Sequence, residues 1–161
     1  MSRPRVEYSV RPCEETDHEA LVAVYASTRA SEIAHLPWTA EQADAFVRSQ
    51  FELQERDWSG RRPRAECSVL IVGGRVVGRL VIDRDGVDLH VVDIALLDET
   101  RGLGIGSAII RELAEEADRD GRGITLFVEE GSRAARFYAR LGFVEIDCVG
   151  VHRHLRRAPT T

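Results

Sequence analysis

The sequence predicts a mixed α/β (α+β) domain over residues 1–161, built on a mostly antiparallel sheet. Three β-branched segments follow one another between residues 66 and 97 with no helical pattern between them, which excludes a doubly wound parallel sheet. Two helical patterns precede these segments and two follow them. A hydrophobic content of 43% and a charged content of 30% indicate a globular chain with one core of ordinary size.

Alternation and a capping pattern define the first two elements. Polar and apolar residues alternate from about Val6 to Pro12, which predicts a strand. Thr16 followed by Glu19 forms a capping-box pattern, and this predicts a helix that reaches about Ile33.

A second helix and a hairpin are expected next. Thr39 with Gln42 forms another capping box, and apolar residues between 43 and 54 then share one helical face. The pair Gly73-Gly74 separates two β-branched segments, which is a strong hairpin signal.

Strands and helices alternate in the C-terminal half. We expect a strand over 87–97, a helix over 105–119, a strand over 123–130 and a short helix over 132–141. One or two strands over 143–158 complete the order β-α-α-β-β-β-α-β-α-β(-β). The helix over 105–119 has an apolar stripe that consists of Ile105, Ile109, Leu113 and Ala117.

Composition excludes several classes of function. The net charge of −5 argues against nucleic acid as a partner, because phosphate binding needs a basic face. No lysine occurs, so a P-loop and a lysine Schiff base are excluded. The three cysteines are far apart and form no CxxC, so neither a disulfide framework nor a metal site is expected, and a reducing cytoplasm fits. No apolar segment is long enough to predict a membrane span.

Three glycines alternate at the start of the helix over 105–119, at Gly102, Gly104 and Gly106. Such a cluster is sometimes only a tight turn. A dinucleotide fingerprint fails here, because the hairpin upstream is incompatible with the βαβ unit that it needs. The remaining interpretation is an anion site, where bare backbone N–H groups and the helix dipole face a phosphate.

The stretch "RGLGIGSAII" resembles the Arg/Gln-x-x-Gly-x-Gly/Ala motif of the GNAT (GCN5-related) N-acetyltransferase superfamily. The stretch "ARFYARLGFVEI" resembles the FYxxxGF helix and strand of the same superfamily, and the similarity covers roughly residues 6–157. The resemblance implies transfer of an acetyl group from acetyl-CoA to a primary amine of a small molecule or peptide.

The resemblance also implies roles for particular residues. The strand before the loop would separate from its neighbour, so that its backbone binds the pantetheine arm and polarises the thioester carbonyl. Tyr138 matches the tyrosine that protonates the leaving thiolate; its alternative role is packing on the helix. The implied coenzyme-binding residues are Ile94, Ala95, Leu96, Arg101, Gly102, Leu103, Gly104, Ile105, Gly106, Ser107, Ser132 and Phe137.

Two side chains are candidates for the general base. His90 stands where some relatives carry a glutamate, and a neutral imidazole accepts a proton near pH 7. Asp93 interrupts an apolar run. Strand parity puts them on opposite faces, whereas a bulge would put them on the same face. A water chain to solvent is equally compatible, and either residue could instead be structural.

The first helix supplies candidates for the acceptor side. Tyr25, Arg29 and Glu32 share one helical face, where a carboxylate could bind an ammonium group and an arginine could bind a carboxylate. The alternative is a solvated Arg29–Glu32 ion pair.

Two further alternatives stay open. Gly131 stands where many relatives have an asparagine that contacts the pantetheine arm, so a non-catalytic acyl-CoA-binding sensor or partner domain is the first alternative. The second is transfer of another acyl group, because pocket volume decides acyl-chain preference. We also expect a homodimer formed through the edge over 143–157, which a mass measurement by light scattering would test.

Overall fold

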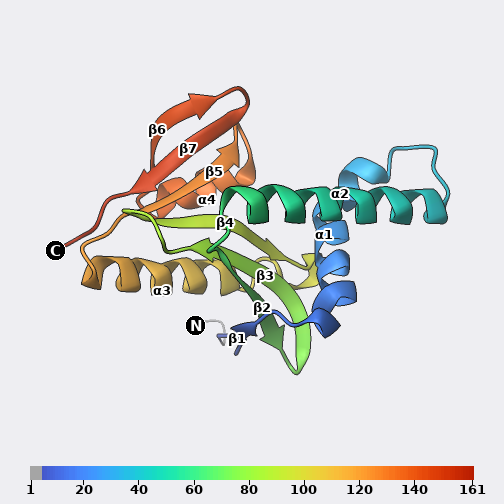
Figure 1. The fold of residues 1–161 in the computed structure, drawn as a ribbon, viewed down its shortest axis with the longest axis horizontal. Coiled ribbons are helices and arrows are strands. Elements are labelled where there is room, and N and C mark those ends of the chain that lie inside the picture. Colours follow the sequence, from blue (N-terminus) through green and yellow to red (C-terminus); the bar gives the residue numbers. More distant parts are fainter. Residues whose placement is uncertain (1–4) are drawn as a thin grey trace.

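In the computed structural model, which describes residues 5–161, seven strands form one sheet in the order β1-β2-β3-β4-β5-β7-β6 (Figure 1). Neighbouring strands are antiparallel except for β4 and β5, which are parallel. The elements are β1 (Ser9–Pro12), α1 (His18–Ile33), α2 (Ala40–Arg61), β2 (Glu66–Val72), β3 (Arg75–Asp83), β4 (Leu89–Leu96), α3 (Ile105–Arg119), β5 (Ile124–Glu129), α4 (Arg133–Arg140), β6 (Val144–Val149) and β7 (His152–Arg157). The predicted order and fold class are confirmed.

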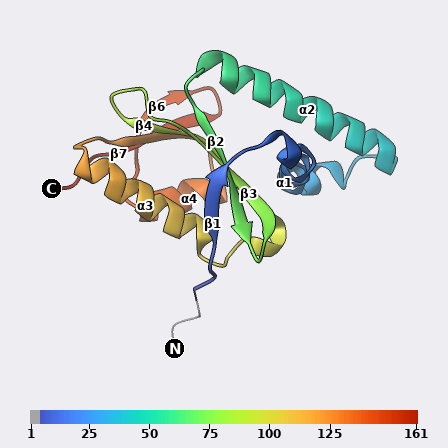
Figure 2. The same ribbon diagram turned by 60° about the horizontal axis from the view of Figure 1, so that its bottom comes forward.

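The helices cover the two faces of the sheet in pairs, as Figures 1 and 2 show together. Helices α3 and α4 pack on one face, where the predicted apolar stripe of α3 is buried with side chains of β3, β4 and β5. Helices α1 and α2 pack on the other face, where Leu21, Tyr25 and Phe51 meet Val69 of β2. Among residues 5–161, none of the helices combines the length and the apolar character that crossing a bilayer requires.

The two capping boxes had different outcomes. The box at Thr39 is confirmed, because its hydroxyl accepts from the N–H of Gln42 at 3.1 Å and the Gln42 amide accepts from the N–H of Thr39 at 2.9 Å. The box at Thr16 is wrong. A short 3₁₀ turn precedes α1, and its box pairs Glu14 with Asp17. Asp17 takes this position because Arg11 of β1 binds its buried carboxylate at 2.7 and 2.9 Å.

The expectation of no disulfide is also wrong. Cys13 and Cys67 are bonded, although they are 54 residues apart in sequence. The register of β1 on β2 puts Pro12 opposite Ser68, and the N–H of Cys13 donates to the carbonyl of Cys67 at 3.0 Å. Only this long-range pairing brings the two thiols together, so spacing along the chain carries no signal for it. Cysteine usage therefore does not support a reducing compartment for this chain.

A bulge in β4 decides which side chains face which layer. Val81 of β3 lies opposite Asp93, whereas the next residue of β3 lies opposite Val91, so Val92 is the extra residue. Beyond the bulge, Ile94 faces the α3 layer, as Val91 does before it. His90 and Asp93 consequently share the other face, which is the arrangement that the bulge alternative described.

The parallel pairing of β4 with β5 is short. It joins Leu89, His90 and Val91 to residues 124–126 and ends there. The rest of β4 stays paired with β3 only, so its other edge is open beside the first residues of α4.

Strand β6 is one of the two edge strands of the sheet, at the far end from β1, and its side chains are exposed throughout. Val144, Ile146 and Val149 are the large apolar residues on it. An exposed apolar edge strand is typical of a surface that pairs with another chain. The homodimer stays a prediction.

Replacement of Gly78 should be costly, because β3 and β4 approach closely there. A Cβ at this position would lie 2.6 Å from the carbonyl oxygen of Ala95, 2.8 Å from a methyl of Leu96 and 2.9 Å from a methyl of Leu70. We expect Gly78→Ala to lower the free energy of unfolding by about 1–3 kcal/mol, as overpacking does. Urea denaturation measures this value.

Gly60→Ala is the matched control, because Gly60 lies in α2 and a Cβ there meets nothing within 4 Å. It should raise the stability by up to about 1 kcal/mol through helix propensity. Equal stability of Gly78→Ala and the unmodified chain would contradict the packing argument.

Candidate functional site

Two cavities meet where β4 leaves β5. The loop cavity, of about 630 Å³, lies between the glycine loop and α4. The helix cavity, of about 400 Å³, lies between α1, β3, β4 and the start of α4. Ile94 of β4 and Ala134 of α4 line both cavities. The two cavities therefore adjoin at these two residues, which we call the junction.

Backbone amides form the end of the loop cavity at α3. Gly102 and Gly104 have φ angles of 75° and 84°, in the left-handed region that favours glycine. A Cβ at either position would meet no atom within 4 Å, so the space beside the loop is open. Within residues 5–161 the amides of 102–107 donate to no backbone carbonyl. Free N–H groups at the start of a 15-residue helix are suited to an anion.

Three arginines add positive charge to the loop cavity. Arg101 donates to the Asp98 carboxylate at 2.5 Å and to the carbonyl of Leu96 at 3.2 Å, so it also braces the loop against β4. Arg133 and Arg140 line the cavity from α4. Sequence reasoning missed these two, although their spacing of two helical turns puts them on one face.

Tyr138 lies in the wall of the loop cavity with only 5% of its surface exposed. The rings of Phe137 and Phe143 contact its ring edge-on, with centroids 5.0 and 5.3 Å away. Burial, reinforced by the negative charge of Asp93, raises the pKa of Tyr138 well above its usual value. The phenol therefore keeps its proton at neutral pH, and its hydroxyl has no protein partner in the described part of the chain.

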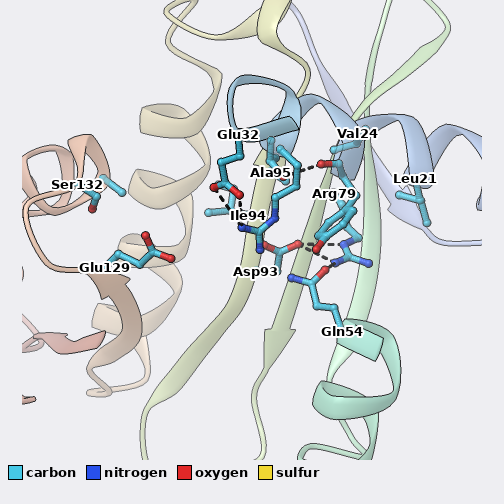
Figure 3. A pocket seen from close by; sticks show the side chains of 14 residues that line it. Leu21, Val24, Glu32, Gln54, Arg79, Asp93, Ile94, Ala95, Glu129 and Ser132 are labelled. Carbon is cyan, nitrogen blue, oxygen red and sulfur yellow. Dashed lines mark hydrogen bonds and ion pairs between the residues drawn. The ribbon is translucent and has the colours of Figure 1, made fainter. Parts of the chain in front are cut away.

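A buried arginine forms the floor of the helix cavity (Figure 3). Arg79 of β3 is 3% exposed and donates to one oxygen of Asp93 at 2.9 and 3.0 Å. The same guanidinium contacts Glu55 and donates to the side-chain oxygen of Gln54 at 2.9 Å, both on α2. Burial raises the pKa of Asp93, and the charge of Arg79 opposes that rise. Asp93 is thus a cavity carboxylate that is more basic than an exposed one.

The three residues predicted on the first helix all line the helix cavity. Arg29 lies over the ring of Tyr25, with its guanidinium carbon 5.4 Å from the ring centroid. Its contacts with the Glu32 carboxylate are long, at 3.4 and 3.5 Å. Arg29 and Glu32 therefore form the solvated ion pair and also line the cavity, so the two alternatives do not exclude each other.

Glu129 and Ser132 face these groups from the opposite side of the cavity (Figure 3). The Ser132 hydroxyl accepts from the N–H of Ala135 at 3.2 Å and caps α4. Glu129 ends β5 and forms no ion pair with any residue of 5–161. Sequence reasoning missed Glu129. The alternation of β5 was a usable signal, because Val128 faces the core and Glu129 therefore faces away from it.

His90 lines neither cavity, although the bulge puts it on the same face as Asp93. Its Nδ1 lies 2.8 Å from the hydroxyl of Thr125, and its ring contacts Phe127 edge-on at 5.7 Å. Burial, with a smaller effect of nearby Arg62, lowers the pKa of His90 to about 4. The imidazole is thus neutral and packed between strands at neutral pH.

Gly131 has a φ of 72°, and a Cβ there would meet nothing within 4 Å. Asparagine tolerates this left-handed region better than most residues. The same backbone conformation therefore suits either glycine or asparagine, and the glycine leaves the adjacent space open.

The chain belongs to the GNAT acetyltransferase family, because the model of the acetyltransferase (GNAT) domain matches residues 63–145, just over half of the chain. A 75-residue segment is 32% identical to an uncharacterized N-acetyltransferase of Methanocaldococcus jannaschii. That segment covers 45% of this chain and 48% of the relative, so the match spans about half of that protein's length.

Solved structures share the fold at low identity. The PaiA N-acetyltransferase from Thermoplasma acidophilum, in complex with coenzyme A, has a TM-score of 0.70 and 16% identity over 94% of this chain and 99% of its own. The ribosomal-protein-S18-alanine N-acetyltransferase from Escherichia coli has a TM-score of 0.62 and 18% identity over 96% of each chain. Both likenesses concern the fold.

The low pKa of His90 predicts a loss of stability in acid. Between its ordinary pKa of 6.5 and about 4, the unfolded chain binds a proton on this residue that the folded chain does not. As the pH is lowered through this window, the free energy of unfolding should therefore fall. The contribution of His90 to this fall is up to about 3 kcal/mol. His90→Gln does not titrate, so urea denaturation across this range should show a smaller loss.

His35→Gln removes an exposed histidine and serves as the control. It leaves the buried His90 in place, so the acid loss of stability that His90 causes should persist in this variant. Parallel stability curves for His90→Gln and the unmodified chain would contradict the assignment.

Proposed function

We propose that this chain is an acetyl-CoA-dependent N-acetyltransferase that acts on a primary amine of a small molecule or peptide. The observation that carries the proposal is the junction of the two cavities at Ile94 and Ala134. One cavity has the backbone N–H groups and arginines that suit a polyphosphate, and the other has the ionised groups that suit an amine. Membership of the GNAT family supports acetyl transfer as the reaction.

The chain's residues fit coenzyme A along the loop cavity. The amides of 102–107 would bind the pyrophosphate, and Arg101 with Arg133 and Arg140 would supply charge. The open edge of β4 over 94–96 would pair with the amide groups of the pantetheine arm, while Phe137 would pack beside it. When bound, acetyl-CoA would supply an acetyl group activated as a thioester.

Tyr138 is the proton donor in this proposal. The amine nitrogen would form a bond to the acetyl carbon, and the carbon–sulfur bond would break to release a thiolate. The phenol proton would pass to that sulfur, which requires a phenol that is protonated at neutral pH, as Tyr138 is. A backbone N–H of β4 at 94–96 would stabilise the negative charge on the carbonyl oxygen.

Asp93 is the proton acceptor that the geometry favours over His90. It lines the helix cavity next to Ile94, whereas His90 lines neither cavity. Its raised pKa makes it a better base than an exposed carboxylate. The charge of Asp93 also raises the pKa of Tyr138, so the proposed acid and base are close enough to interact electrostatically.

Tyr138→Phe tests the acid role. We expect turnover, measured as thiol release from acetyl-CoA with a panel of primary amines, to fall by about 10²–10⁴-fold. The affinity for coenzyme A, measured by calorimetry, should change little because the ring and its packing remain. Tyr8→Phe is the matched control, since it removes a phenol that donates to Glu112 at 2.7 Å.

Undiminished turnover in a folded Tyr138→Phe variant would refute the acid role. Coenzyme A binding without thiol release by the unmodified chain on any amine would refute the enzymatic proposal and support the sensor alternative.

A further inference from the structure

We propose that the acceptor is an amine that also carries a carboxylate, and that Arg29 selects it by binding that carboxylate. This inference rests on the proposed function and specifies its acceptor. It follows from the position, the charge and the unsatisfied donors of the groups around the helix cavity.

The helix cavity is lined from two sides. In the proposed reaction the nitrogen would lie at the junction, beside Ile94 and Ala134, because these residues line both cavities. Glu129 lies on the side of the cavity formed by β5 and the start of α4 (Figure 3). Arg29 and Glu32 project from α1 on the opposite side. A small acceptor with its amine at the junction thus presents its remaining groups to α1.

The two arginines of the cavity differ in how far their donors are satisfied. Arg79 is buried, and three side chains of α2 and β4 bind its guanidinium. The Arg29 side chain is 40% exposed, and its carboxylate partner Glu32 is 66% exposed and no closer than 3.4 Å. The ring of Tyr25 under its guanidinium limits where Arg29 can lie. Arg29 is therefore held in place with donors that an incoming carboxylate can use.

The charges around the cavity also favour a zwitterion. Asp93 shares the charge of Arg79 with Glu55, and Glu32 is loosely matched by Arg29. Glu129 is the remaining carboxylate of the lining, and no residue of 5–161 forms an ion pair with it. An ammonium group at the junction would neutralise Glu129, while a carboxylate at α1 would displace exposed Glu32 from Arg29. A diamine would instead put a second positive charge against Arg29.

Arg29→Gln tests the inference with matched acceptors, for example an α-amino acid and its carboxamide. We expect kcat/KM for the carboxylate-bearing acceptor to fall about 10- to 100-fold, the usual value of a charged hydrogen bond. The value for the carboxamide should change less than about threefold, because uncharged groups gain little from the guanidinium. Arg29→Lys keeps the charge but loses the two-pronged geometry, so it should fall in between.

Glu32→Gln gives a second readout of opposite sign. It removes the competing carboxylate, so the KM for the carboxylate-bearing acceptor should fall. A role for Glu32 in holding the substrate ammonium predicts a rise in KM for both acceptors, and that result would overturn the inference. Arg61→Gln is the control, because Arg61 is an exposed arginine of α2 that pairs with Asp57 away from the cavity.

The outcomes separate this inference from the proposed function. If the unmodified chain releases thiol with amines but Arg29→Gln affects both acceptors of a pair equally, the carboxylate inference fails and the acetyltransferase proposal stands. A preference of the unmodified chain for the carboxamide would overturn the carboxylate inference in the same way. If no amine supports thiol release, the proposed function itself fails.

Discussion

The bulge at Val92 is the constraint on which the arrangement of both cavities depends. One extra residue in β4 keeps Ile94 toward the α3 layer and turns Asp93 toward α1 and α2. A regular strand would place Asp93 in the apolar layer, where a carboxylate is costly unless it is paired. The bulge also coincides with the end of pairing to β5, so the edge of β4 opens at the point where its side chains change face.

Arg79 extends this constraint to the helices. Its guanidinium joins Asp93 of β4 to Glu55 and Gln54 of α2, and the guanidinium carbon lies over the ring of Phe51, 5.4 Å from its centroid. A buried charge network of this kind adds little net stability over an apolar core, but it penalises any arrangement that leaves a member unpaired. It therefore sets the position of α2 relative to β4 more than it strengthens the fold, and it fixes the part of the helix cavity that Arg79, Asp93 and Gln54 line.

Local signals were enough for most of the fold. The Gly73-Gly74 hairpin, the Thr39 cap and the apolar stripe of α3 each depend on residues a few positions apart, and the structure has all three. The start of α1 was misplaced because Arg11, outside the helix, holds Asp17 in the capping box of the 3₁₀ turn that precedes α1. The disulfide was missed for a similar reason, because the pairing of β1 with β2 brings together two cysteines that are far apart in sequence.

The same distinction between local and long-range signals applies to the candidate site. The glycine loop and Tyr138 are short motifs and were visible in the sequence, as was the shared face of Tyr25, Arg29 and Glu32. Arg79 and Glu129 enter the helix cavity through strand pairing and through the end of β5, and no local pattern marks such positions as functional. The position of the bulge likewise depends on the register between β3 and β4, which a single strand does not reveal.

The disulfide between Cys13 and Cys67 has a topological consequence for the wall of the helix cavity that α1 and α2 form. Cys13 and Cys67 are 54 positions apart, and the segment between them contains all of α1 and α2, so both helices belong to one covalently closed loop anchored at the edge of the sheet. A closed loop has fewer open conformations to gain when it detaches, so the bond lowers the entropy of any partly opened state of these helices. In thiol-reducing solution the same helices would depend on packing and on polar contacts such as those of Arg11, Arg79, Ser27 and Arg62. The oxidation state of two cysteines outside the helix cavity therefore sets how freely one of its walls can open.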